Sequence, residues 1–245
     1  QRSGALLVDL PDALPSLACD DASLGEAVTR FIRTWLDQPG NNNLGPGAEG
    51  KAWEDVLVGF SSGTGPVWES LKEHVAPFHW TPAEAFALGA GSSPEPAPSP
   101  YPADLTVISW ALCQSEAARA GNRAQTFYPA EAWARSRMFG QECNVRLHRA
   151  LIEALVAAGH QAVAPALLPE WVQQPSPRYG LASSWSERHV AYACGLGTFG
   201  LTGGLITARG QAIRLGSVLV RARISPTPHA YEGPFDYCLF LSRGL

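Results

Sequence analysis

A nearly continuous apolar run, DLTVISWAL at residues 104–112, limits most strongly what this chain can fold into. A strand without polar alternation is buried on both faces, so we expect it inside a sheet that helices cover on both sides. The region that follows supports this, because Pro129–Ala158 carries apolar residues at helical spacing and ends at Gly159, a C-terminal stop signal. A buried strand followed by a long helix predicts a layered architecture.

Shorter helix and strand patterns lie on either side of this pair. Residues 23–37 show amphipathic helical spacing, and Thr81-Pro82-Ala83-Glu84 has the residues of a helix start. Short strands are expected at residues 55–60, 161–164, 204–207 and 212–220. The order of these elements predicts an α/β or mixed α+β fold with a sheet flanked by helices.

The 245 residues are 46% hydrophobic, which is enough for one large domain or a domain with a small cap. The net charge of -4 predicts no general attraction to nucleic acid or to an anionic membrane. No apolar run approaches the roughly 20 residues that a membrane helix needs. Residues 1–17 make a poor signal peptide, so we expect a cytoplasmic protein; the start at Gln1 leaves an upstream segment open.

A Pro- and Ser-rich stretch, GSSPEPAPSPYP at residues 91–102, cannot hold a packed element. We expect it to divide the chain, with a long surface loop as the alternative. The expected parts are an N-terminal helical cap region (1–90), the Pro/Ser-rich loop (91–103), an α/β domain (104–230) and a C-terminal segment (231–245).

Five cysteines stand at wide spacing, at Cys19, Cys113, Cys143, Cys194 and Cys238. An odd number without a Cys-x-x-Cys pair predicts no disulfide framework. We interpret the first four as ordinary buried thiols.

The stretch GLGTFG at residues 195–200 matches the glycine pattern of dinucleotide-binding folds. That site needs a strand before it, a helix after it and an acidic residue about 20 positions on. Here an Ala-rich helical stretch precedes the glycines, and the next acid after Glu187 is Glu232, so a Rossmann site is not predicted. The glycines are either a tight helix-to-strand connection or a backbone wall against a large flat ligand.

The run ERHVAYACGLGTFGLTGGLIT at residues 187–207, followed by IRLGSVLV, resembles the epoxyqueuosine reductase and reductive dehalogenase superfamily. In that superfamily an Ala-rich helix beginning with Glu-Arg leads into a Gly-Leu-Gly-x-x-Gly turn, and a strand of the Leu-Gly-Ser-Val type follows. Upstream segments that resemble an iron–sulfur branch of the superfamily lie at residues 55–63, 77–85, 105–112 and 122–144. The resemblance covers most of residues 22–244.

The resemblance implies a nitroreductase-like α/β domain that holds a corrinoid, cobalamin, and that precedes a ferredoxin-like module with two 4Fe–4S clusters. The glycine turn would then lie against the corrinoid, which carries the redox chemistry. The cofactor-binding residues implied in this way are Gly195, Leu196, Gly197, Thr198, Phe199, Gly200, Ser217 and Arg188.

In epoxyqueuosine reductases a Gly-x-Asp-Tyr-His motif supplies the acid that protonates the substrate. Here the stretch GQECN at residues 140–144 occupies that place, so the resemblance implies Glu142 as the catalytic acid. The alternative is a surface ion pair, because Glu142 and Arg146 stand four residues apart on the expected helix. The Tyr and His of the motif are replaced, and Leu201 stands in place of the lysine that usually follows the glycine turn.

The segment 188–231 contains arginines and no acidic residue. Its arginines suit the phosphate of cobalamin or the phosphates of tRNA, with a solvated strand face as the alternative. His189 is a candidate cobalt ligand, although a single histidine on an Ala-rich helix is more often packed or solvated.

The last residues, YEGPFDYCLFLSRG at 231–244, resemble the segment that enters the first iron–sulfur cluster. Cys238 would be the first metal ligand of a four-cysteine cluster, and its three partners do not occur before Leu245. We therefore expect a fragment, a truncated protein or a relict that has lost its electron entry.

The first hypothesis is a cobalamin-dependent, iron–sulfur-linked oxidoreductase of the epoxyqueuosine reductase type, which reduces its substrate at low-valent cobalt with a side-chain proton donor. The implied partners are a small-molecule or modified-nucleoside substrate, tRNA, and an electron donor such as ferredoxin or flavodoxin; no membrane partner is expected. The alternatives are a non-catalytic corrinoid-binding module and an NADPH- or flavin-dependent nitroreductase-type enzyme.

Overall fold

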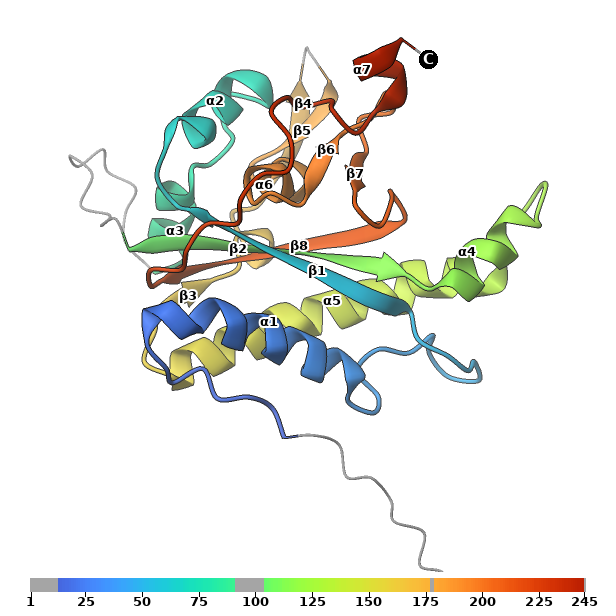
Figure 1. The fold of residues 1–245 in the computed structure, drawn as a ribbon, viewed down its shortest axis with the longest axis horizontal. Coiled ribbons are helices and arrows are strands. Elements are labelled where there is room, and N and C mark those ends of the chain that lie inside the picture. Colours follow the sequence, from blue (N-terminus) through green and yellow to red (C-terminus); the bar gives the residue numbers. More distant parts are fainter. Residues whose placement is uncertain (1–12, 91–103, 177–178, 245) are drawn as a thin grey trace, which may run out of the picture.

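A four-stranded antiparallel sheet forms the centre of the computed structural model, which describes residues 13–90, 104–176 and 179–244 (Figure 1). Its strands lie in the order β1 (Trp53–Ser62), β2 (Leu105–Gln114), β8 (Ile213–Arg221) and β3 (Ala162–Val163). Strand β2 pairs along nearly its whole length with both neighbours, whereas β3 pairs only with Leu219 and Val220 of β8. The expected fold class, α/β or α+β, is confirmed.

Helices cover both faces of this sheet (Figure 1). On one face lie α1 (Asp21–Asp37) and α5 (Glu131–Ala157), and on the other lie α2 (Pro66–His74), α3 (Pro82–Gly89) and α6 (Glu187–Ala193). All ten residues of β2 are therefore buried, as the apolar run predicts. Alternate side chains enter different cores, with Ile108 and Trp110 packed toward α1 and α5 and Val107 packed toward the other helices.

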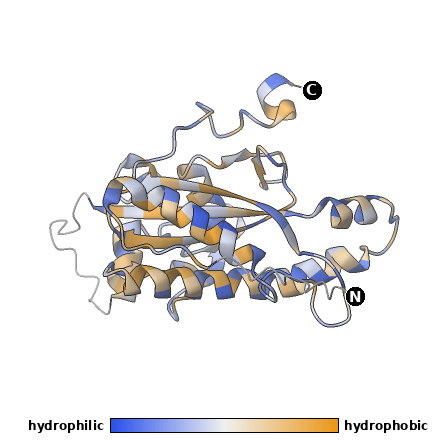
Figure 2. Cartoon of the chain, turned by 60° about the horizontal axis from the view of Figure 1, so that its bottom comes forward, coloured by the Kyte–Doolittle hydropathy of each residue, from blue (hydrophilic) through white to orange (hydrophobic). Residues whose placement is uncertain are grey.

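The remaining elements are short and lie outside the central sheet (Figure 1). Two hairpins pair β4 (Gln173–Ser176) with β5 (Gly180–Ser183), and β6 (Gly197–Phe199) with β7 (Leu205–Thr207). The others are α4 (Glu116–Arg123), the 3-10 turn η1 (Pro165–Leu167) and α7 (Leu239–Arg243). Figure 2 shows hydrophobic residues along the central strands and on the helices that pack against them.

The region expected as an N-terminal cap, residues 1–90, shares its core with the region expected as the α/β domain. Strand β1 is hydrogen-bonded to β2 from Trp53 to Ser62, and Val56 lies in the same buried cluster as Leu112 of β2 and Val218 of β8. The cap region thus supplies a strand of the central sheet as well as helices, because β1 completes the sheet beside β2. The Pro/Ser-rich stretch at 91–103, expected as the divider, lies outside the described residues.

The ends of two helices form as their sequences predict. At the start of α3, the Thr81 hydroxyl accepts a hydrogen bond from the Glu84 N–H, and the Glu84 carboxylate accepts one from the Thr81 N–H. At the end of α5, Gly159 has a φ of 91° and its N–H donates to the Val156 carbonyl. A left-handed glycine of this kind stops a helix because other residues rarely adopt that conformation.

One stretch of β8 depends on helix side chains for its edge contacts. Because β3 stops opposite Leu219, no strand within the described residues lies on that side of β8 from Ile213 to Ser217. Asn144 of α5 donates from Nδ2 to the Leu215 carbonyl at 3.0 Å, and the Ser217 N–H donates to His148 Nε2 at 3.3 Å. Asn144 Oδ1 also accepts from Trp110 Nε1 at 2.8 Å, so one amide joins α5, β2 and β8.

This arrangement predicts that Asn144→Ala strongly destabilises the fold. The substitution leaves the Trp110 indole N–H and the Leu215 carbonyl buried without partners, and each loss costs roughly 1–3 kcal/mol of unfolding free energy. Urea denaturation followed by circular dichroism measures the effect. Glu153→Ala, an exposed change on the same helix, should stay within about 0.5 kcal/mol of the wild type. Equal stability of the two variants would contradict the role given to Asn144.

Candidate functional site

A cavity of about 1000 Å³ lies along the edge of β8 that has no neighbouring strand. Its wall comes from α5, β8, the start of α6, η1 and both hairpins. The lining residues are Arg137, Gln141, Asn144, Val145, His148, Ala166, Leu167, Trp171, Gln173, Ser183, Trp185, Ser186, Glu187, Arg188, Gly204, Leu205, Gln211, Ile213, Arg214 and Leu215. These are more polar than an ordinary core, and they come from both layers that cover the sheet.

The side chains of β8 point alternately to the two layers that cover the sheet. Gly216 faces α5, because a Cβ there would meet Trp110 at 2.6 Å and His148 at 2.7 Å. Ser217 faces the other layer, where its Oγ accepts a hydrogen bond from Trp185 Nε1 at 2.9 Å. Arg214 shares the parity of Gly216 and therefore lies on the α5 side. The cavity wraps around the strand edge and reaches both layers.

Glu187 is the unusual residue on the Ser217 side. Both carboxylate oxygens are buried, and neither has a hydrogen-bond partner among the described residues. Burial raises the pKa of Glu187 from 4.5 to about 7, and the nearby Ser217 hydroxyl opposes this shift. A carboxyl group with this pKa carries its proton in about half of the molecules at neutral pH, so Glu187 can donate or accept a proton there.

The histidines around the site are neutral. His148 donates from Nδ1 to the Asn144 backbone carbonyl at 2.7 Å and accepts at Nε2, and burial lowers its pKa to about 4. His189 does not line the cavity; its Nδ1 meets the Ser186 hydroxyl at 2.8 Å, its ring lies against Phe199, and burial lowers its pKa to about 3. His189, the candidate cobalt ligand, is thus engaged by Ser186 and Phe199 outside the residues that line the cavity.

Three arginines give the cavity a positive character, and Glu187 is the only acidic residue among those that line it. Arg188 is exposed and donates to the Gly203 carbonyl at 2.7 Å. Arg137 and Arg214 lie across from each other on α5 and β8, and neither forms an ion pair within the described parts of the chain. A cavity of this charge favours an anionic ligand.

The glycines of GLGTFG are explained by contacts inside the chain. Gly195 ends α6 with a φ of 78°, and Gly197 lies so close to the Ile206 carbonyl of β7 that no Cβ fits between them. A Cβ at Gly200 would meet the Gln211 amide at 2.7 Å. Residues 195–200 connect α6 to the hairpin, with 197–199 forming β6, and none of them is among the residues that line the cavity; their role as a wall against a cofactor stays a prediction.

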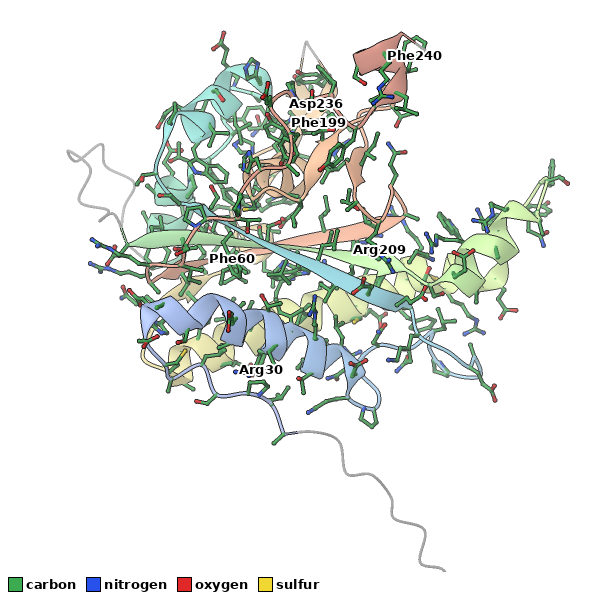
Figure 3. All side chains as sticks on the ribbon, viewed as in Figure 1. Arg30, Phe60, Phe199, Arg209, Asp236 and Phe240 are labelled. Carbon is green, nitrogen blue, oxygen red and sulfur yellow. The ribbon has the colours of Figure 1, made fainter. Side chains whose placement is uncertain are left out.

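The C-terminal segment covers the other side of this hairpin. The Phe199 N–H donates to the Pro234 carbonyl at 2.7 Å, and the Thr198 hydroxyl accepts from the Tyr237 N–H at 2.9 Å. Figure 3 shows Phe199 and Asp236 close together in the layer above the sheet. Leu196 is buried in a small cluster with Ala111 and Ala191. These predicted cofactor contacts therefore lie in packed or covered positions.

The structure brings together only part of the predicted site. Arg188 lines the cavity, and Ser217 lies beneath it in contact with the Trp185 indole. Glu142 lies on an exposed side of α5, outside the residues that line the cavity. The alternative ion pair with Arg146 is not formed, because that guanidinium donates to the Gly40 and Asn41 carbonyls instead.

Thiols and metal ligands are dispersed. Burial raises the pKa of Cys113 to about 11 and that of Cys143 to about 12, and it raises the pKa of Cys194 well above its usual value, as expected for core thiols. Cys19, also expected to be buried, is exposed. The pKa of Cys238 is lowered, mainly by the Leu241 N–H. Among the described residues, no three His, Cys, Asp or Glu side chains are grouped to hold a metal ion. No helix in the described ranges combines the length and apolar character needed to cross a bilayer.

Sequence reasoning missed the residues that define this site. Glu187 was noted as the start of an Ala-rich helix, and Arg214 as one of several strand arginines. A signal for Glu187 was available, because it is the one acid between Glu170 and Glu232. No signal in the sequence joins Arg137 to Arg214, which are 77 positions apart and meet only through the packing of α5 on β8.

The raised pKa of Glu187 predicts a pH-dependent stability that Glu187→Gln removes. Between pH 4.5 and about 7 the folded wild type binds more protons at this site than the unfolded chain, so its stability falls as pH rises. The variant should gain stability relative to the wild type from pH 5 to pH 8, by on the order of 3 kcal/mol. Denaturant titrations at both pH values measure the difference, with Glu153→Gln as control. A pH-independent difference would contradict the buried carboxyl.

The chain is similar to several solved structures, at low sequence identity and low TM-score. The chain is similar to a crystal structure of epoxyqueuosine reductase with an epoxyqueuosine-modified tRNA-Tyr stem loop, at 12% identity and a TM-score of 0.40, over 89% of this chain and 50% of that one. The epoxyqueuosine reductase from Bacillus subtilis matches at 14% identity and a TM-score of 0.38, over 88% of this chain and 50% of that one. The enzyme from Streptococcus thermophilus matches at 13% identity and a TM-score of 0.38, over 77% of this chain and 47% of that one.

The chain spans about half the length of these solved structures. No protein-family model matches the sequence, and no curated protein matches it.

Proposed function

We propose that this chain is the cofactor-binding domain of a corrinoid-dependent reductase of the epoxyqueuosine reductase type. The observation that carries the proposal is the cavity of about 1000 Å³ with the unpartnered carboxyl of Glu187 in its wall. A large cavity with one neutral acid suits a reduction that needs a bulky cofactor and a proton. The motif at residues 187–207, which ends in the hairpin beside this cavity, supplies the link to the superfamily.

The residues present fit a corrinoid in size and polarity. The volume lies at the upper end of the roughly 300–1000 Å³ found for small-molecule sites, as a macrocycle requires. Side-chain amides of Gln141, Gln173 and Gln211 line the cavity, together with the arginines. Cobalamin carries amide side chains and a phosphate, which match donors of these two kinds.

Each residue has a definite task in this proposal. A corrinoid in the cavity would supply the low-valent cobalt that reduces the substrate. Glu187 would hold the proton at a carboxyl oxygen, since no neighbouring group takes it. The Ser217 hydroxyl, fixed by its hydrogen bond from the Trp185 indole, would lie near the carboxyl, and the neighbouring apolar core would limit the access of water to it.

The proton donor is thereby moved from Glu142 to Glu187. Glu142 remains exposed on α5, whereas Glu187 combines burial with access to the cavity. The other implied partners stay as parts of the proposal, namely a ferredoxin- or flavodoxin-type electron donor, a small-molecule or modified-nucleoside substrate, and tRNA. The described residues do not fit a 4Fe–4S cluster, because Cys238 has no grouped ligands, so no step is assigned to a cluster.

Retention of the cofactor is the first test. The purified chain, mixed anaerobically with cob(II)alamin and desalted, should keep close to one equivalent of corrinoid in its absorbance spectrum. Gln141→Trp places an indole in the cavity and should abolish retention, whereas Glu153→Trp on the exposed part of the same helix should not. Loss of corrinoid from the folded wild type, or nicotinamide oxidation without corrinoid, would contradict the proposal.

The proton donor is tested in the loaded protein. With titanium(III) citrate as the electron source and a model epoxide as substrate, we expect Glu187→Gln to lower the reduction rate about 10²-fold or more at unchanged corrinoid retention. Glu153→Gln is the control. The wild-type rate should also decline as pH rises through about 7, where Glu187 loses its proton. A loss of rate in Glu142→Gln alone would return the role to Glu142, and retention without any turnover would indicate a non-catalytic corrinoid-binding module.

A further inference from the structure

Arg137 and Arg214 form a pair of like charges without a counterion in the described parts of the chain. Seven ion pairs occur among the described residues, and neither arginine takes part in any of them. Both side chains line the cavity, Arg137 from the first turns of α5 and Arg214 from β8. Acidic side chains are available elsewhere on the surface, but none lies in this part of the wall.

The guanidinium of Arg214 is the more constrained of the two. The strand alternation places it between β8 and α5, and its Nε atom is buried with no hydrogen-bond partner. Burial lowers the pKa of Arg214, and the charge of Arg137 lowers it further. The second effect shows that the two guanidinium groups are near enough to repel each other.

Such an arrangement is costly when no anion is present. Arg137 is exposed, so water screens part of its charge, but two like charges that face the same cavity without a counterion still repel. A buried N–H without an acceptor adds the free energy of its lost hydration. Guanidinium groups bind oxyanions through two parallel N–H donors each, so one phosphate or carboxylate between them would remove both costs.

We infer that Arg137 and Arg214 form a binding site for an oxyanion, which is the phosphate or carboxylate group of an organic ligand in the cavity. Gln141 stands one turn after Arg137 on α5, also lines the cavity, and offers a neutral amide donor. Glu187 does not oppose the anion, because it lies on the other side of β8. This inference goes beyond the proposed function and does not require a corrinoid, because the arginines, not the cofactor, define the site.

The test uses the corrinoid-free chain and inorganic phosphate as the probe. At constant ionic strength set with sodium chloride, phosphate should raise the thermal unfolding midpoint of the wild type. The increase should level off at high phosphate concentration, as expected when a specific site fills. Arg137→Gln and Arg214→Gln should each weaken the apparent phosphate affinity at least tenfold. Arg149→Gln, an exposed change of equal charge on α5, should leave it unchanged.

A second readout separates an anion site from a structural role. Without phosphate, Arg137→Gln should be at least as stable as the wild type, because it removes a repulsion. No phosphate effect in the wild type, or an equal loss of affinity in Arg149→Gln, would overturn the inference. If Arg214→Gln fails to fold, Arg137→Gln still decides the question.

The ligand that brings the oxyanion is identified by two further titrations. Acetate replaces phosphate in the first titration. The anion that stabilises the protein more strongly shows whether the site prefers a carboxylate or a phosphate. In the second, phosphate is added to the cob(II)alamin-loaded protein. Displacement of corrinoid would assign the site to the cofactor phosphate, and simultaneous binding would assign it to a substrate. Both results support the site, and neither depends on the turnover assay.

Discussion

The free edge of β8 is the constraint on which the rest of this structure depends. A central strand that loses its neighbour halfway must satisfy its backbone by other means, and here α5 does so with Asn144 and His148, one turn apart. The same two side chains hold α5 at a fixed depth and register against the sheet, with Trp110 packed against the His148 ring. The space left beyond them, where no strand is present, is the cavity.

The strand edge also separates the chemistry of the cavity into two parts. Arg137 and Arg214 lie on the α5 side, whereas the α6 side holds the buried carboxyl of Glu187 and the exposed Arg188. The backbone of β8 stands between the Glu187 carboxyl and the guanidinium groups of Arg137 and Arg214, and burial is the main cause of the raised pKa of Glu187. One ligand that spans the edge would meet an anion-binding part and a proton-donating part of the same cavity.

Local patterns predicted much of the fold and little of the site. The apolar run of β2, the capping residues of α3 and the glycine stop after α5 depend on neighbours in the sequence, and all three were predicted. For the glycines at 195–200 the sequence left a tight connection and a cofactor wall open, and the structure adds close backbone contacts with Ile206 and a left-handed glycine at the end of α6. Glu187 owes its raised pKa to burial by distant elements, which spacing along the chain does not encode.

The inner face of α5 divides into two functional halves along its length. Asn144 and His148 maintain the sheet, whereas Arg137 and Gln141, earlier on the same face, only border the cavity. Substitutions in the second group leave the backbone contacts of β8 intact, so selection can alter them at little cost to folding. A lineage carrying this domain can therefore diverge in the molecules it accepts through changes in the first three turns of one helix, while the remainder of that helix stays under constraint.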